Sequence, residues 1–99
     1  MKMSAYYCFP AIFSKDQDDN LNLRFVDIDE AYTFASNNDY DELAYNARDV
    51  LQLSLEGRIE DGEKIPEPTK IDKIKVVENE TIILVTTVVK GDRDDLWWN

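Results

Sequence analysis

Residues 39–62 contain the sequence pattern that most restricts the fold. Asp39 is a residue type that caps helix N-termini, and Glu42 completes a capping-box pattern three positions later. Apolar or small side chains then recur at three- and four-residue steps: Leu43, Ala47, Val50, Leu51, Ser54 and Leu55. Gly62 is a plausible helix stop, and the prolines beyond it cannot continue a helix. We therefore predict one amphipathic helix with a single apolar face.

Strand patterns precede this helix. Residues 4–14 are rich in aromatic and branched side chains, and residues 21–25 alternate between apolar and polar types. A polar cluster separates the two segments, so they are expected to form a hairpin. Residues 31–35 predict a third, shorter strand with Tyr32 and Phe34 on one face.

Two strands carry a signal for their position in the sheet. Pro10 lacks a backbone donor, which predicts an edge position or a bulge for the first strand. Residues 81–89 follow the helix and are apolar on both faces, which is typical of a strand in the interior of a sheet.

The order β-β-β-α-β predicts an α+β fold, a two-layer sandwich in which one main helix covers an antiparallel-rich sheet. We expect a single domain over residues 1–90. A charged C-terminal tail over residues 91–99 contains Trp97 and Trp98. These tryptophans are expected to dock on their own domain, on a twin subunit or on a partner, and the sequence leaves the three alternatives open.

Charge restricts the possible partners. The chain has 11 Lys and Arg against 21 Asp and Glu, a net charge of −10. Such a field repels phosphate backbones, which argues against direct nucleic-acid binding, and it attracts a basic protein. The same balance is also common in ordinary soluble domains.

Features of enzymes are mostly missing. The chain has no histidine, which removes the usual general base, and its three glycines cannot form a phosphate-binding loop. Cys8 is expected to be a buried small side chain in a strand. One segment has the oxygen spacing of a calcium loop, at Asp16, Asp18, Asn20, Asn22 and Asp27. Leu21 stands where that loop needs glycine, so a hairpin turn is expected instead. We predict no catalytic residues, no cofactor and no metal.

The chain also lacks membrane and export signals. No apolar run approaches the roughly 20 residues that cross a bilayer, and the first residues show no signal-peptide pattern. A cytoplasmic protein without membrane contact is expected.

Four segments together resemble the HicB family of antitoxins, the acidic halves of bacterial or phage toxin–antitoxin pairs. They are residues 9–13, 25–28, 44–56 and 61–69, of which the last is the most specific. The resemblance spans roughly residues 6–89. The chain lacks the Pro-Gly-Cys segment that usually precedes the family's helix.

This resemblance implies a partial ribonuclease-H-like sheet with a packed helix and no nuclease activity. It also implies binding of a small basic HicA-like ribonuclease toxin, whose RNA surface the antitoxin masks. Many relatives carry a C-terminal DNA-binding domain, which this chain is not expected to have.

For partner binding we select Asp41, Asp49 and Glu56 on the exposed helix face, together with Trp97 and Trp98. An orphan HicB-like module that forms homo-oligomers without a toxin is the alternative, and a homo-oligomer is expected in either case. A carboxylate-metal nuclease using Asp16, Asp18 or Asp27 is a third, less favoured hypothesis.

Overall fold

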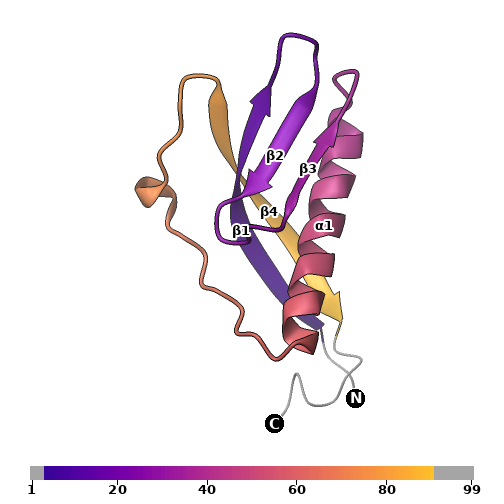
Figure 1. Ribbon diagram of the computed structural model, residues 1–99, viewed down its shortest axis with the longest axis vertical. Coiled ribbons are helices and arrows are strands. Elements are labelled where there is room, and N and C mark those ends of the chain that lie inside the picture. The colour runs from indigo at the N-terminus through magenta and orange to yellow at the C-terminus, as the bar shows by residue number, and fades with distance from the viewer. Residues whose placement is uncertain (1–3, 91–99) are drawn as a thin grey trace.

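The computed structural model describes residues 4–90, and it confirms the α+β class (Figure 1). The elements are β1 (Ser4–Lys15), β2 (Leu21–Phe25), β3 (Tyr32–Ala35), α1 (Tyr40–Glu60), a short 3₁₀ helix η1 (Ile71–Lys73) and β4 (Glu80–Lys90). The sheet has the order β3-β2-β1-β4, and each neighbouring pair is antiparallel. The predicted β-β-β-α-β order is therefore present.

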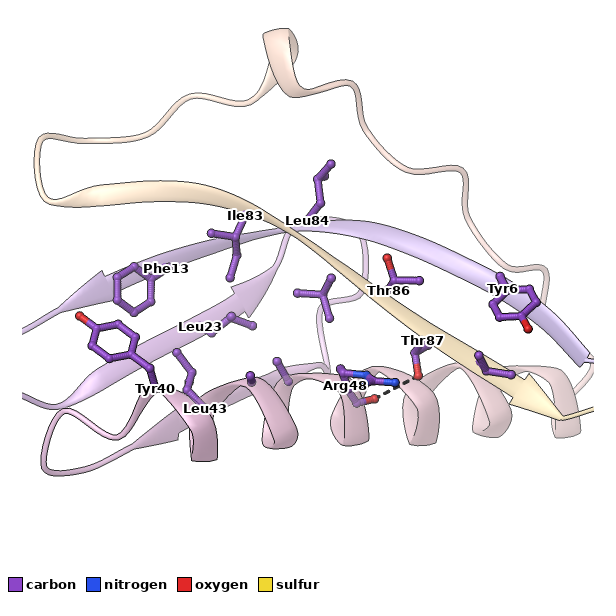
Figure 2. Close-up of a pocket in the computed structure, with 14 residues that line it drawn as sticks. Tyr6, Phe13, Leu23, Tyr40, Leu43, Arg48, Ile83, Leu84, Thr86 and Thr87 are labelled. Atoms are coloured by element: carbon purple, nitrogen blue, oxygen red, sulfur yellow. Dashed lines mark hydrogen bonds between the residues drawn. The ribbon is translucent and has the colours of Figure 1, made fainter.

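One face of the sheet packs against α1. The connection between α1 and β4 runs on the other side of the sheet, which we call the open face (Figure 2). The core combines alternate strand residues with one stripe of α1. Its buried members are Phe9, Ala11, Leu21, Leu23, Phe25, Ile28, Ala31, Ala35, Leu43, Ala47, Leu51, Leu55, Val85 and Val89. Burial of this single stripe holds α1 on the sheet.

Both ends of α1 are closed by local hydrogen bonds. The Asp39 carboxylate accepts from the Glu42 backbone N–H at 3.0 Å, which satisfies one of the unpaired donors of the first turn. At the other end, Gly62 has a φ of 74°, a conformation that favours glycine. The N–H of Gly62 donates to the Ile59 carbonyl at 3.1 Å, and that of Glu63 donates to the Arg58 carbonyl at 2.8 Å. The helix prediction is confirmed.

The strand order overturns the two predictions about edges. The first strand, β1, lies inside the sheet between β2 and β4, whereas β4 is an edge strand. The Pro10 carbonyl accepts from the Val26 N–H at 3.2 Å, just beyond Phe25, where β2 ends. The backbone N and O atoms of one strand residue point to the same side of the strand. The nitrogen of Pro10, which carries no hydrogen, therefore points toward the end of the β2 ladder. Proline is tolerated there without an edge position.

Side-chain contacts fix the turns and the long connection. The Asp27 carboxylate accepts from the Thr69 N–H at 2.9 Å and also from the Thr69 hydroxyl. Arg58, in the last turn of α1, donates twice to Glu30, at 2.8 and 2.9 Å. The hydrogen bond from Arg58 lowers the pKa of Glu30 to about 2. This ion pair ties the end of α1 to the turn between β2 and β3.

Cys8 differs from expectation. It lies in β1 as predicted, but its side chain is exposed rather than buried. Alternation along β1 places Phe9 in the core, so its neighbour Cys8 belongs to the open face.

Candidate partner-binding surface

The outer face of α1 brings together the three acidic residues selected from the sequence. Asp41 and Asp49 are exposed, and Glu56 is partly exposed. At about 100° per residue the three directions fall within roughly 80° of one another, on the side away from the buried Leu51. The Gln52 side chain donates to the Glu56 carboxylate at 3.3 Å, which restrains that carboxylate. We call Asp41, Asp49 and Glu56 the acidic stripe.

Sequence reasoning did not select Tyr45, which lies on the same side of α1. Its side chain is 71% exposed, and it is four residues from both Asp41 and Asp49. Residues four apart are neighbours on a helix surface, so Tyr45 lies between Asp41 and Asp49 along this side of α1. The signal was available in the sequence, since an aromatic residue stood on the polar face of an amphipathic helix.

A shallow hollow extends the acidic stripe toward β4. It measures about 510 Å³, and it is lined by Ala44, Tyr45, Arg48, Asp49, Gln52, Thr87 and Val88. The buried Thr87 hydroxyl donates to the Arg48 carbonyl at 3.4 Å, a bond that connects α1 with β4 and is the dashed line in Figure 2. Both residues line the hollow. The outer face of α1 and the C-terminal half of β4 therefore form one continuous surface.

A larger, mostly apolar groove of about 580 Å³ follows β4 (Figure 2). Six consecutive strand residues, 83–88, line it together with α1 residues that include Tyr40, Leu43 and Arg48. Ile83 points toward α1, and Leu84 points to the opposite side of the sheet (Figure 2). Because the lining includes residues from both faces, the groove runs along the backbone edge of β4.

The other residues selected from the sequence, Trp97 and Trp98, lie outside the described residues. Their contribution to binding stays a prediction.

The carboxylates with calcium-like spacing have other roles. The Asp16 carboxylate accepts from the N–H groups of Asp18 and Asn20, at 2.8 and 3.0 Å, and so closes the β1–β2 turn. The bond from the Asn20 backbone is the largest cause of a lowered Asp16 pKa. Asp27 instead holds Thr69. Within residues 4–90 there is no group of three or more His, Cys, Asp or Glu side chains placed to hold a metal ion.

Across the same residues, no helix combines the length and the apolar character needed to cross a membrane.

The fold and its surface define a small acidic α+β domain whose exposed helix and strand edge suit contact with another protein. Residues 8–85 match the model of a protein family described as a HicB-like antitoxin of bacterial toxin–antitoxin systems. The chain therefore belongs to the HicB-like antitoxin family. Membership implies a toxin as partner and suggests a non-enzymatic role. Among curated proteins, none matches the chain.

Proposed function

We propose that this chain neutralises a small basic ribonuclease toxin of the HicA kind by covering the toxin's RNA-binding surface. The family match over residues 8–85 carries this proposal. An RNA-binding surface is rich in Lys and Arg because it must hold phosphates, so an acidic protein surface is its natural competitor.

The geometry supports the acidic stripe as the contact. Asp41, Asp49 and Glu56 share one side of α1, and carboxylates there are able to pair with cations that otherwise hold RNA phosphates. The exposed Tyr45 ring supplies an amphipathic anchor among them, of the kind enriched at interface hot spots. The net charge of −10 steers the encounter of the two proteins.

The same charge leads us to propose that this domain does not bind operator DNA by itself, since phosphate backbones repel it. The cytoplasm, where RNA and toxin meet, is the proposed site of action.

The test starts from the reading frame next to the gene for this chain: if it encodes a small basic protein, the two are co-expressed. Growth arrest by that protein alone, relief by this chain, and a complex between the two purified proteins are expected. If the complex forms without relief of RNA cleavage, the masking mechanism is wrong.

Two matched variants test the stripe. The first combines Asp41→Asn, Asp49→Asn and Glu56→Gln, and the second combines Asp18→Asn, Asp72→Asn and Glu78→Gln on exposed sites away from α1. Both remove three negative charges, so both weaken long-range steering equally. We expect the stripe variant to bind the toxin roughly tenfold more weakly than the control variant. Equal affinities would remove the stripe from the interface.

We also propose that Trp97 and Trp98 contact the partner. They are the only two tryptophans of the chain, so intrinsic fluorescence reports on them directly. Burial against the toxin is expected to shift their emission to shorter wavelength, provided that the toxin lacks tryptophan or that its own emission is subtracted. An unchanged spectrum in a saturated complex excludes the tail from the interface.

An orphan homo-oligomeric module is the second candidate, and the exposed edge of β4 is the observation that favours it. The genomic neighbour separates the two candidates: a short basic reading frame that contains histidine favours the toxin pair.

A further inference from the structure

The strand β4 has the composition of an interior strand but the position of an edge strand. Its central residues are apolar on both faces, whereas edge strands are usually short or protected by charges. The groove of about 580 Å³ follows this edge, where residues 83–88 line it in unbroken succession (Figure 2). One further strand in the groove would give β4 the neighbour that its composition predicts.

The backbone of β4 alternates in direction from one residue to the next. The Pro10 carbonyl is bonded to the β2 side, so the neighbouring Ala11 directs its backbone groups to β4, opposite Ile83. Odd-numbered residues of β4 therefore bond to β1, and even-numbered ones, up to Lys90 at its end, direct their N–H and C=O groups outward. Within residues 4–90 nothing bonds to the outward backbone groups of Ile82, Leu84, Thr86 and Val88.

The sequence directly after β4 is typical of a hairpin turn. Gly91 and Asp92 follow the last residue of β4, and a Gly-Asp pair is one of the usual two-residue hairpin loops. The first loop position needs a positive φ, which favours glycine. In such a loop the flanking residues, Lys90 and Arg93, exchange backbone hydrogen bonds. Because the Lys90 backbone points outward, the turn has the phase that this edge requires.

The same register matches the composition of the tail to the groove. The pairs that follow from Lys90 with Arg93 are Leu96 with Thr87, Trp97 with Thr86, and Trp98 with Val85. The charged residues 93–95 then stand beside residues 88–90, at the end of the groove, and the three bulky uncharged residues stand along it. Directly opposite residues share one face of a sheet, so Trp98 belongs to the α1 side and Trp97 to the open face.

We propose that residues 93–98 of the same chain form a fifth strand on this edge, antiparallel to β4, with the Trp98 indole in the groove between β4 and α1. Ala44 and Arg48 line the α1 wall of that groove, and both are exposed within residues 4–90. An indole there covers apolar surface, and an arginine against its ring adds a cation–π attraction. The inference goes beyond toxin binding and does not depend on it. Trp97 stays on the open face, where a partner is able to contact it.

A segment of the same chain is favoured over a separate molecule by proximity. A two-residue loop holds the tail at the edge at every protein concentration. A second copy of the chain instead brings a net charge of −10 toward an equal charge. The added strand is held on one side only, so it opens separately from the sheet, and its loss should lower the free energy of unfolding little.

Two single-tryptophan variants of the full chain test the position of Trp98. Trp97→Phe leaves Trp98 alone and Trp98→Phe leaves Trp97 alone, so each variant is the control for the other. In the free chain, acrylamide should quench Trp98 at least about threefold less than Trp97, because the groove encloses Trp98 on the α1 side. Trp98 should also emit at shorter wavelength. Equal quenching of the two indoles overturns the inference.

Dilution distinguishes the tail from a second copy. The low quenching of Trp98 should persist over a dilution of about a hundredfold, because an intramolecular contact does not depend on concentration. Protection that disappears on dilution assigns the groove to a second copy and overturns the inference. The toxin is absent from this measurement. Exposed Trp98 in a chain that binds toxin overturns the fifth strand alone, and enclosed Trp98 in a chain that binds no toxin overturns the proposed function alone.

A second pair of variants tests the turn. Gly91→Val places a branched residue where a positive φ is needed, and Asp92→Gly keeps a favourable turn as its matched control. Gly91→Val should accelerate hydrogen exchange of the outward N–H groups of Leu84 and Thr86 roughly tenfold or more, and Asp92→Gly should not. The inward N–H of Val85 should stay protected in both variants, which shows that the sheet still folds. Fast exchange of Leu84 and Thr86 in the wild type, or equal behaviour of the two variants, overturns the inference.

The register is measured by NMR. Non-hydrogen-bonded pairs bring opposite Cα atoms to about 4.5 Å, so strong α-proton contacts are expected between Thr87 and Leu96 and between Val85 and Trp98. A register shifted by one residue would turn Trp97 instead of Trp98 toward α1. Such contacts, or none between the tail and β4, overturn the proposed strand.

Discussion

The two edges of the sheet are protected very differently. At one edge, β3 has four residues and lies against α1, and the Asn46 side chain donates to the outward carbonyl of Phe34 at 3.3 Å. At the other edge, β4 has eleven residues, and within residues 4–90 nothing bonds to the outward backbone groups of Ile82, Leu84, Thr86 and Val88. A short, covered edge ends a sheet, whereas a long edge with unpaired backbone groups is able to pair with a further strand.

This contrast arises because different sides of α1 face the β3 edge, the core and the solvent. One α1 side chain, Asn46, donates a hydrogen bond to the β3 edge. The apolar stripe of α1 packs into the core, and its acidic stripe points outward. Near β4 the helix supplies only one wall of a groove. Edge protection and the proposed partner binding therefore involve different sides of the same helix.

The largest expected effect tests which backbone groups of β4 hold it in the sheet. Thr87→Pro removes an inward N–H that bonds to β1, together with the hydroxyl that donates to Arg48, and should cost about 3 kcal/mol or more of unfolding free energy. Thr86→Pro removes an outward N–H and should cost under about 1 kcal/mol. Urea unfolding of dilute protein measures both. Equal losses would mean that the outward and inward N–H groups of β4 contribute equally to the fold.

The next effect concerns the anchoring of α1 over β3. Leu51 is fully buried, so Leu51→Ala should lower the free energy of unfolding by about 3 kcal/mol through lost burial and a cavity. Leu53→Ala, on the exposed side, is the control and should change it by less than about 0.5 kcal/mol. Thermal unfolding compares them, and a similar loss for both would contradict the position of α1.

A smaller effect is expected at the start of α1, close to the β3 edge. Asp39→Ala removes the side-chain acceptor for the Glu42 N–H and should cost about 1 kcal/mol. Hydrogen exchange should accelerate in the first turn of α1 and stay unchanged in β4. Acceleration at both edges would show that the two regions open together.

The smallest effect depends on pH. The pKa of Glu30 is lowered to about 2 from an ordinary value of 4.5, so its ion pair with Arg58 stabilises the fold fully above pH 4.5. That stability is lost as the pH falls toward 2. Because the Glu30 side chain is half exposed, we expect only about 0.5–1 kcal/mol.

The variant Arg58→Gln should return the Glu30 pKa to its ordinary range, and NMR titration of the Glu30 carboxyl measures the shift. It should also flatten the acid limb of the stability curve. A Glu30 pKa that stays near 2 without Arg58 would assign the shift to another group.

Local structure followed from local sequence. The Asp39 cap, the repeat from Leu43 to Leu55 and the stop at Gly62 act within a few residues of one another, and they define α1 correctly. Alternation likewise predicts β2 correctly, with Leu21, Leu23 and Phe25 all buried. These signals are independent of what the segment later packs against.

The site was only partly predictable. Helical spacing alone predicts that Asp41, Asp49 and Glu56 lie on one side of α1, without any tertiary information. Their role in binding stays a prediction. The hollow beside Tyr45 was not found, because β4 forms its second wall and lies far away in the sequence.

The sequence alone determined the α+β class, the bounds of α1 and the net charge of −10. Only the tertiary structure decided which strands are edges. Pro10 and the two apolar faces of β4 pointed to the opposite arrangement. Strand order depends on pairing between segments that are distant in the chain. A proline beside the end of a ladder looks the same in sequence as a proline in an edge strand, and an edge strand with two apolar faces looks the same as an interior strand.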